Sequence, residues 1–370
     1  MKKSICWITS GYLLQVDLPI LHKIKEHFNV KWIVYAQHHS DMAQHALSYA
    51  RKYEIEIIIF NSRHHRYNPL IYLDYVKQMR MLSKMDADIY YFNIIAFPYL
   101  LFAIKHYIPY QKIVMAMHHG KIHNGMQLRH LYKYYLRYLC KQDFYFQYFS
   151  ESQAKYFTGD KNRYNVIPLA LNDFGHSNKV PAQNIITFLS FGNIIETKNI
   201  GLLIQAAEEV KKHSNHVFKV KIVGHCRNWE HYQQLIKHPE IFDLHIERVS
   251  DLEIPDLFAS ANYLVLPYKS VTQSGPLRIA YGYNTPVITS DLDGFKESVV
   301  ENVTGLMFKT ENVKSLAMLM QNVIENHPKK YLQLKEMQKR YVDENLKVDV
   351  VVDKYIQMFN SIINNYEIER

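Results

Sequence analysis

Short β-branched runs alternate with amphipathic helical stretches along the whole chain of 370 residues. Strands that alternate with helices of ten or more residues predict parallel sheets built from βαβ units. The pattern occurs twice, on either side of the turn-rich segment Ile167–Pro181. The expected strands are Ser4–Thr9, Val30–Tyr35, Glu56–Phe60, Ile89–Phe92, Ile113–Met117 and Phe146–Ser150, and then Ile186–Phe191, Phe218–Val223, Leu244–Ile246, Tyr263–Leu266, Pro286–Thr289 and Gly305–Phe308.

This pattern predicts an α/β protein with two facing, doubly wound Rossmann-like domains. We expect the domains to span residues 1–175 and 176–345, with a C-terminal helix in 346–370 that returns to the first domain. The length agrees, since domains usually hold about 100–200 residues. Ligands of such sheets bind beyond the carboxyl ends of the strands. Functional residues are therefore expected just after strands, in a cleft between the domains.

Positive charge is concentrated in the first half of the chain. Residues 1–175 hold 22 Lys and Arg against 12 Asp and Glu, whereas the remainder holds 22 against 23. An anionic partner of the first half is favoured, and an ordinary solvated basic surface is the alternative. A nucleic acid is disfavoured because no recognition motif accompanies the charge. A dinucleotide cofactor is disfavoured because no Gly-x-Gly-x-x-Gly follows a strand.

Cysteine usage and hydropathy indicate a cytoplasmic protein. Cys6, Cys140 and Cys226 lie far apart without a Cys-x-x-Cys pair, which argues against a zinc site or a disulfide framework. The longest uncharged stretch, Ile89–Ile104, is shorter than the ~20 residues that span a bilayer. The apolar N-terminus is interrupted by polar residues, so a first strand is expected there in place of a signal peptide.

The segment Thr272-Gln-Ser-Gly-Pro276 joins a strand to a helix. Pro276 suits the first helical turn, where free N–H groups and the helix dipole favour an anion. Such a turn binds a diphosphate without a metal. The hydroxyls of Thr272 and Ser274 would add hydrogen bonds, and Gly275 would let a ligand approach the backbone. An ordinary helix cap by Ser274 is the alternative.

The opening of the second domain offers further groups at the same sheet edge. Gly192 ends the first strand there and is followed by Asn193, and Lys198 lies in the loop before a helix. Gly224 ends the next strand. We expect Lys198 to face the same anion as the Thr272–Pro276 turn.

Three histidines, His118, His119 and His123, follow the apolar strand Ile113–Met117. A neutral histidine can donate a hydrogen bond to a developing phosphate or sugar oxygen. The alternative is an exposed cluster of loop histidines. Zinc is disfavoured because no carboxylate or cysteine accompanies them.

Two Asp-x-Asp triplets, Asp86–Asp88 and Asp291–Asp293, are interpreted as structural. The first precedes a strand where a metal-binding triplet would end one, and the second lies in the loop after Pro286–Thr289. Glu297 is expected to cap or orient that loop. No metal site is predicted.

The stretch Leu128–Lys141 is expected to be a helix with a basic stripe and an apolar, tyrosine-rich face. This combination suits the anionic inner face of the cytoplasmic membrane or a lipid-diphosphate acceptor. A core-facing helix with a solvated basic side is the alternative. The stripe consists of Arg129, Lys133, Arg137 and Lys141.

Taken together, the order and spacing of these motifs resemble the retaining glycosyltransferases of family 4. The resemblance covers nearly the whole chain but is patchy before residue 110, and no single motif is specific. It rests on His118–His123, Tyr148–Ser152, Val166–Pro168, Phe191–Ile204, Ile222–Gly224, Pro267–Gly275 and Pro286–Glu297.

The resemblance implies a GT-B fold, a nucleotide-diphosphate sugar as co-substrate without a further cofactor, and transfer with retention. It implies a glycan or undecaprenyl-diphosphate-linked acceptor in bacterial capsule, exopolysaccharide or O-antigen synthesis. By position, Lys198 would hold the donor diphosphate, and Gly192, Asn193 and Gly224 would lie near the nucleotide. Gln273, Ser274 and Gly275 would contact phosphate or sugar, and His118 and His123 are the candidate catalytic residues.

The chain departs from the family pattern in several places. Val271 and Ile279 stand where the family has two glutamates, the second of which holds the ribose. Asn193 or Ile195 replaces a diphosphate-binding arginine, and Arg278 is a candidate replacement or a surface residue. These losses favour, as the alternative function, an inactive GT-B binding subunit of a glycosylation complex. A sugar-nucleotide epimerase fits the order of motifs less well.

Overall fold

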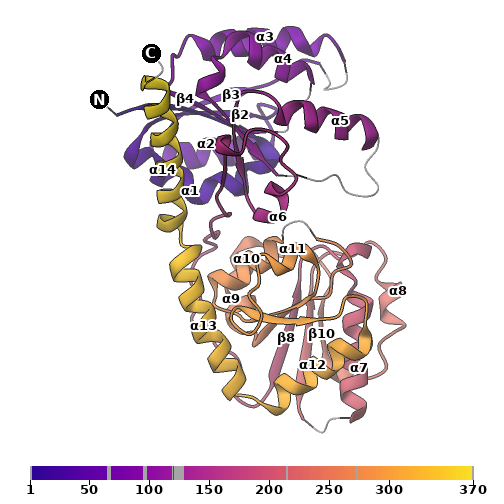
Figure 1. The fold of residues 1–370 in the computed structure, drawn as a ribbon. Coiled ribbons are helices and arrows are strands. Elements are labelled where there is room, and N and C mark those ends of the chain that lie inside the picture. The colour runs from indigo at the N-terminus through magenta and orange to yellow at the C-terminus, as the bar shows by residue number, and fades with distance from the viewer. Residues whose placement is uncertain are drawn as a thin grey trace. The chain divides into compact units, whose positions relative to one another are not determined.

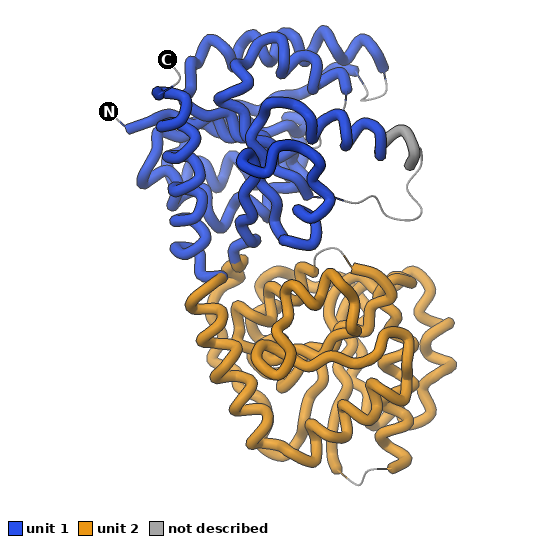
Figure 2. The backbone as a smooth tube through the Cα atoms, in the orientation of Figure 1, with its two compact units in different colours: residues 1–170, 346–370 blue, residues 171–345 orange. Residues whose placement is uncertain are grey.

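The computed structural model describes residues 2–64, 68–94, 98–118, 120, 129–213, 216–271 and 274–368, and side chains from 133 onward in the helix that begins at Arg129. The chain divides into two compact units (Figure 2). Unit 1 comprises residues 1–170 and 346–370, and unit 2 comprises residues 171–345. The chain enters unit 2 at Leu171, within the turn-rich segment that the sequence marks as a linker.

Unit 1 is built on a seven-stranded sheet in which every strand pair is parallel. The strand order is β3-β2-β1-β4-β5-β6-β7, so the order reverses between β1 and β4. The last strand, β7, spans three residues and is too short to stand out in the sequence pattern. The strands are β1 Ser4–Ser10, β2 Asn29–Tyr35, β3 Glu56–Phe60, β4 Ile89–Asn93, β5 Ile113–Met117, β6 Tyr145–Tyr148 and β7 Tyr164–Val166.

Helices cover both faces of this sheet (Figure 1). Because side chains of a strand alternate between faces, Ile5 and Trp7 belong to one core, and Cys6 and Ile8 to the other. Helices α3, α4 and α5 pack on the Cys6 face, and α1 and α14 on the Trp7 face. The helices are α1 Leu14–His27, α2 Asp41–Lys52, α3 Ile71–Ser83, α4 Pro98–Tyr107, α5 Arg129–Cys140, α6 Glu151–Ala154 and α14 Val348–Ile368.

The C-terminal helix α14 completes the core of unit 1. Its Tyr355 and Phe359 are buried against Trp7 and Tyr91 of the central strands. The hydroxyl oxygens of Tyr355 and Tyr91 lie 3.3 Å apart, and Tyr91 also donates to Gln147 at 2.9 Å. The last residues of the chain therefore fold with the first ones.

Unit 2 repeats the plan with a six-stranded parallel sheet in the order β10-β9-β8-β11-β12-β13. Helices α7 and α12 pack side by side on one face of it, where Tyr331 and Leu334 of α13 join the same core (Figure 1). Helix α10 contacts α13. The strands are β8 Ile186–Phe191, β9 Phe218–Val223, β10 Phe242–His245, β11 Tyr263–Leu266, β12 Val287–Ser290 and β13 Gly305–Phe308. The helices are α7 Ile200–His213, α8 Glu230–Gln233, α9 Ile254–Ala259, α10 Gly275–Gly282, α11 Asp293–Lys296, α12 Val313–Glu325 and α13 Lys329–Asn345.

Both sheets reverse their order at one point, between β1 and β4 and between β8 and β11. Parallel sheets bind ligands beyond the strand ends at such points. The prediction of two doubly wound, Rossmann-like domains is confirmed.

None of the helices within the described residues combines the length and apolar character needed to cross a membrane. Short 3-10 turns are Gly11–Leu13, Tyr110–Lys112, Lys161–Arg163, Glu196–Lys198, Pro239–Ile241 and Asp251–Glu253.

Candidate functional site

In unit 2, glycines form a bare backbone ledge at the ends of β8 and β9. Gly192 has φ +105° and Gly224 has φ +143°, conformations that other residues rarely adopt. A Cβ on Gly224 would lie 2.2 Å from the carbonyl oxygen of Gly192. The Gly192 N–H donates to the Val223 carbonyl at 3.0 Å, which keeps the two strand ends in contact. Position 224 therefore accommodates glycine and no larger residue.

The N-terminus of α10 lies beside the ledge. A Cβ on Gly192 would be 3.6 Å from the ring of Pro276. Ser274 is buried and caps the helix, its Oγ accepting from the Leu277 N–H at 3.3 Å. A Cβ on Gly275 would meet nothing within 4 Å, so the backbone there borders open space. The cap satisfies one of the free N–H groups of the first turn and leaves others for a ligand.

Lys198 brings a positive charge to the same sheet edge. It is half-buried at the end of the 3-10 turn Glu196–Lys198, and its Nζ lies 3.8 Å above the ring centre of Tyr268. Burial lowers the pKa of Lys198 to about 8. Within the described part of the chain, no carboxylate oxygen lies within ion-pair distance of Nζ. A desolvated ammonium on an aromatic face attracts an anionic ligand strongly.

Tyr268 fixes this lysine and was not predicted from the sequence. It is 3% exposed, its backbone oxygen accepts from Ser290 Oγ at 2.8 Å, and its ring packs on Phe295. Burial raises the pKa of Tyr268 to about 12, and a side-chain contact with Ser274 at the start of α10 opposes part of this rise. The one sequence feature that could have identified Tyr268 is its position directly after a buried strand and Pro267.

The residues at the family's two glutamate positions differ in their surroundings. Ile279 is 6% exposed within α10, so this position has neither a carboxylate nor an open path to a ligand. The carbonyl oxygen of Val271 would lie 2.6 Å from a Cβ on Gly294, which packs the turn against α11. Arg278 is half-buried beside Tyr281 and Tyr341, and burial lowers the pKa of Arg278.

An open groove of about 1250 Å³ adjoins the ledge. Its wall includes Asn193, which is exposed, together with Arg227, Tyr232 and Lys269. Lys269 is 3.4 Å from a carboxylate oxygen of Glu196 and is therefore already paired. The groove gives Asn193 access to a ligand, which Ile279 lacks.

Glu297 stands at the C-terminal end of α11, in the loop after β12. Its Oε1 is buried and has no hydrogen-bond partner in the described structure. The role of Glu297 in orienting this loop stays a prediction. Asp291 of the same loop does form hydrogen bonds, since its Oδ1 accepts from the backbone N–H and hydroxyl of Thr310 at 2.8 and 2.6 Å.

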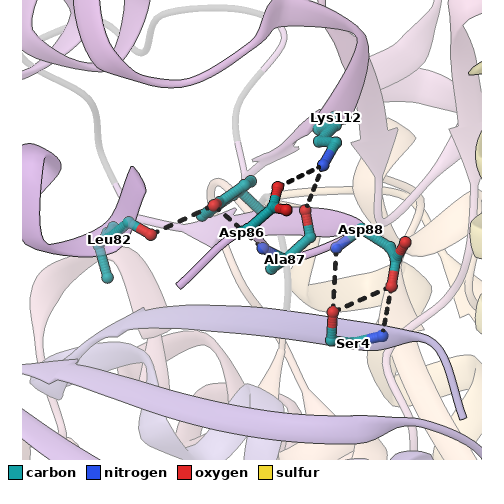
Figure 3. A network of polar contacts seen from close by, with 7 residues as sticks. Ser4, Leu82, Asp86, Ala87, Asp88 and Lys112 are labelled. Atoms are coloured by element: carbon teal, nitrogen blue, oxygen red, sulfur yellow. Dashed lines mark hydrogen bonds and ion pairs between the residues drawn. The ribbon is translucent and has the colours of Figure 1, made fainter. Parts of the chain in front are cut away.

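The first Asp-x-Asp triplet is structural as well (Figure 3). Asp88 accepts from the N–H and hydroxyl of Ser4 at 2.7 and 2.9 Å, which fixes the start of β1 beside β4. Asp86 pairs with Lys112 at 3.2 Å, and Lys112 also donates to the Ala87 carbonyl. No group of three or more metal-ligating side chains occurs within the described residues.

In unit 1, His118 follows β5 and is held by two neighbouring strand ends. Its Nε2 lies 2.6 Å from Oδ1 of Asn93, the last residue of β4, and its ring packs 4.6 Å from that of Phe149, just after β6. Asn93 donates from Nδ2 to Asp17 Oδ1 at 2.8 Å. Asp17 is fully buried and also accepts from Thr9 Oγ1 at 2.6 Å. Sequence reasoning missed this chain of hydrogen bonds.

The loop after His118 is tied to α6. The Gly120 N–H donates to Gln153 Oε1 at 2.8 Å, and a Cβ on Gly120 would lie 1.9 Å from the Gln153 carbonyl oxygen. The remaining predicted site residues in this loop and in the α10 turn lie outside the described residues, as does the side chain of Arg129. They are His119, His123, Thr272 and Gln273.

Comparison with known proteins shows what unit 2 is similar to. Residues 174–341 match the family model described as glycosyl transferases group 1. The prediction of a glycosyltransferase is confirmed at this level, since the match covers the unit that holds the glycine ledge, Lys198 and the start of α10. No curated protein matches the chain in a sequence search.

Solved glycosyltransferase structures share the fold over nearly the whole chain. A glycosyltransferase from Rickettsia africae has a TM-score of 0.77 at 16% identity, with 98% of this chain and 99% of that chain covered. Anabaena Alr3699/HepE in complex with UDP has a TM-score of 0.76 at 15% identity, with 97% and 100% covered. Sucrose-phosphate synthase from Thermosynechococcus elongatus has a TM-score of 0.74 at 12% identity, with 98% and 100% covered. At such identities the likeness shows the GT-B fold.

Proposed function

We propose that this glycosyltransferase is a retaining enzyme of family 4 type that takes its sugar from a nucleotide-diphosphate sugar. One observation carries the proposal. The bare ledge of Gly192 and Gly224, the open backbone at Gly275 and the charge of Lys198 lie at one sheet edge, and no carboxylate among the described residues pairs with that lysine. Backbone N–H groups and one desolvated ammonium suit a diphosphate, which leaves with the charge that they stabilise.

We further propose that the diphosphate is bound without a divalent cation. The first turn of α10 supplies N–H groups and the positive end of the helix dipole, and Lys198 supplies a full charge. These groups replace the charge that a metal would contribute. Transfer should therefore proceed in EDTA. Loss of activity in EDTA that Mn²⁺ restores would contradict this part of the proposal.

A thermal-shift screen against UDP-, GDP-, ADP- and dTDP-sugars tests the donor. Anabaena HepE was solved with UDP and glucose, which puts UDP-sugars first in the screen. A donor at 100 times its dissociation constant stabilises by about 2.7 kcal/mol, a shift that is easily measured. The same screen on Lys198→Ala is the matched control. A protein that responds to no nucleotide sugar would contradict the proposed function.

The acceptor is proposed to be a glycan or a lipid-linked glycan of bacterial surface-polysaccharide synthesis, reached at an anionic membrane. Support comes from the outer surface of α4 and α5. Phe102, Tyr134 and Tyr138 are exposed there, and Lys105 donates to the Tyr138 hydroxyl at 3.1 Å. Together α3, α4 and α5 hold six Lys and Arg and one Asp. Cations beside exposed aromatic rings suit a bilayer interface.

Vesicle sedimentation tests the membrane surface. The protein should bind vesicles of phosphatidylglycerol and phosphatidylcholine, and binding should weaken in 0.5 M salt and in the double variant Lys133→Glu, Arg137→Glu. Lys211→Glu, Lys212→Glu on α7 of unit 2 reverses the same number of charges and should bind like wild type. Equal binding to pure phosphatidylcholine would contradict the electrostatic part of the proposal.

An inactive binding subunit is the second candidate function. The observation in its favour is Ile279, which is buried where the family has a ribose-binding carboxylate. Radiolabelled donor separates the two functions. Nucleotide binding without transfer or donor hydrolysis, with the cell's acceptor fraction supplied, would establish the binding subunit and refute the enzyme.

A further inference from the structure

Three strand ends of unit 1 direct polar side chains to the same face of the sheet. Residues two apart in a strand share a face, and the Val114 and Ala116 side chains of β5 belong to the core beneath α1. His118 continues that alternation beyond the end of β5. In the register of β1 and β4, Thr9 is paired with Asn93. The pleat therefore brings Thr9, Asn93 and His118 to the face that α1 covers.

The first turn of α1 places a carboxyl group beneath these side chains. Asp17 lies at helical spacing with Leu14, Leu21 and Ile24, all of which are buried, so it occupies a core position. Its exposure is 0%. A carboxyl group is costly to bury unless hydrogen bonds satisfy it. Here Thr9 donates to one oxygen and Asn93 to the other.

The direction of each hydrogen bond follows from the chemistry of the acceptor. An ionised carboxylate has no proton to donate, so Asn93 must turn its amide N–H₂ toward Asp17. Asn93 then presents its carbonyl oxygen to His118, and a carbonyl oxygen only accepts. The imidazole must therefore carry a proton on Nε2, 2.6 Å away. On the other side, Trp32 Nε1 donates to Thr9 Oγ1 at 2.9 Å, and that hydroxyl donates to Asp17.

We propose that Asp17, acting through Asn93, is a positioning residue that fixes the orientation and the Nε2–H tautomer of His118. The inference rests on the proposed function, with His118 as the catalytic residue that the family resemblance implies. An imidazole held in one tautomer presents the same nitrogen at every turnover, as in other histidines oriented by a hydrogen-bonded partner. Asp17 itself touches no substrate in this account.

The electrostatics of Asp17 agree with this role. Burial raises the pKa of Asp17 to about 7, although the hydrogen bonds from Thr9 and Asn93 favour the charged form. The ionisable groups that face it from the surrounding elements are the phenols of Tyr49, Tyr91 and Tyr355. Burial keeps the pKa of each phenol above 10, so all three are neutral at pH 8. At that pH the Asp17 carboxylate is ionised and accepts the hydrogen bonds from both Thr9 and Asn93.

The test is the tautomer of His118, measured by ¹⁵N NMR of histidine-labelled protein at pH 8 without any ligand. His118→Gln assigns the signal. Wild type and Thr9→Val, which removes the hydrogen bond on the other oxygen of Asp17, should both show the Nε2–H form. Asn93→Leu, of similar size, should show a mixture of His118 tautomers. Asp17→Asn should also lower the population of the Nε2–H form. An Nδ1–H form in wild type, or an unchanged Nε2–H form in Asn93→Leu, would overturn the proposal.

Kinetics with the donor found by the screen connect the tautomer to the reaction. Asn93→Leu and Asp17→Asn should lower kcat about threefold to tenfold with little change in KM for the donor. A fall in kcat through lost folding is recognised by a lower melting temperature, and Asp17→Glu then serves as the variant that keeps the charge. A changed tautomer with an unchanged kcat overturns the positioning role. If His118→Gln also keeps full activity, the failure lies in the proposed role of His118, because the NMR result stands without activity.

Discussion

The two units use the carboxyl ends of their parallel strands in different ways. In unit 1, Thr9, Asn93 and His118 form ordered hydrogen bonds around the buried carboxyl of Asp17. In unit 2, the corresponding edge is bare backbone at Gly192 and Gly224, beside the desolvated Lys198. In the proposed function, the same architecture therefore supplies an oriented imidazole in one unit and a surface for an anion in the other.

This contrast predicts which substitutions disturb folding and which disturb only chemistry. The glycines of unit 2 have no side chain to remove, so a substitution disturbs this region by adding atoms. The hydrogen-bonded side chains of unit 1 are disturbed when a substitution removes one of them. The two units also differ in net charge. Unit 1 holds 25 Lys and Arg against 15 Asp and Glu, whereas unit 2 holds 19 against 20.

The largest effect is expected from Gly224→Ala. The new Cβ would lie 2.2 Å from the Gly192 carbonyl oxygen, in a backbone conformation that alanine rarely adopts. We expect unit 2 to lose roughly 3 kcal/mol or more of its free energy of unfolding, measured by calorimetry. Gly275→Ala is the matched control, because its Cβ meets open space and stability should change by less than about 0.5 kcal/mol. Equal melting temperatures for the two variants would contradict the close contact between Gly224 and the Gly192 carbonyl.

Lys198→Ala should mainly affect the reaction. Lys198 meets the departing diphosphate in the proposed function, so its loss should lower kcat/KM by about 2–4 kcal/mol, as for other groups that stabilise developing charge. Folding should change little, since Lys198 lies in a short turn and has no carboxylate partner in the described structure. Lys212→Ala, a paired lysine on α7, is the control. Wild-type kinetics in Lys198→Ala would exclude this role.

His118→Ala should lower kcat at least tenfold, or by about 1.4 kcal/mol. Nucleotide affinity should stay near wild type, because the proposed nucleotide contacts all lie in unit 2. The comparison of kcat, the dissociation constant for UDP and the melting temperature checks this prediction. A variant that simply unfolds would show that His118 serves packing against Phe149 instead.

The smallest effect is a pH dependence of diphosphate binding. Only the charged form of Lys198 attracts the ligand, and its pKa is about 8. Affinity for UDP should therefore fall as pH rises through 8, by about fourfold between pH 7 and 8.5. Calorimetric titration at the two pH values measures this, and Lys198→Arg should remove the dependence because arginine stays charged. A pH-independent affinity in wild type would show that Lys198 does not face the diphosphate.

Particular elements show how far sequence reasoning reached. The period-two and helical patterns predicted ten of the thirteen strands to within one residue at each end, as for Ser4–Thr9 against Ser4–Ser10. Strand β7, of three residues, was missed because so short a run has no detectable period. The Ser274 cap and the position of Lys198 after β8 also followed from local sequence, since caps and loops depend on neighbours along the chain.

The sequence by itself therefore determined the fold class, the two strand-helix repeats and the glycine turns, because these depend on local periodicity and backbone conformation. Only the tertiary structure decided which distant residues meet. Asp17 reads as an interruption of an apolar run, and its burial against Thr9 and Asn93 depends on strand order and register. Tyr268 beneath Lys198 joins residues 70 positions apart in sequence. Such contacts carry no local signal, since they arise from packing that the whole sheet imposes.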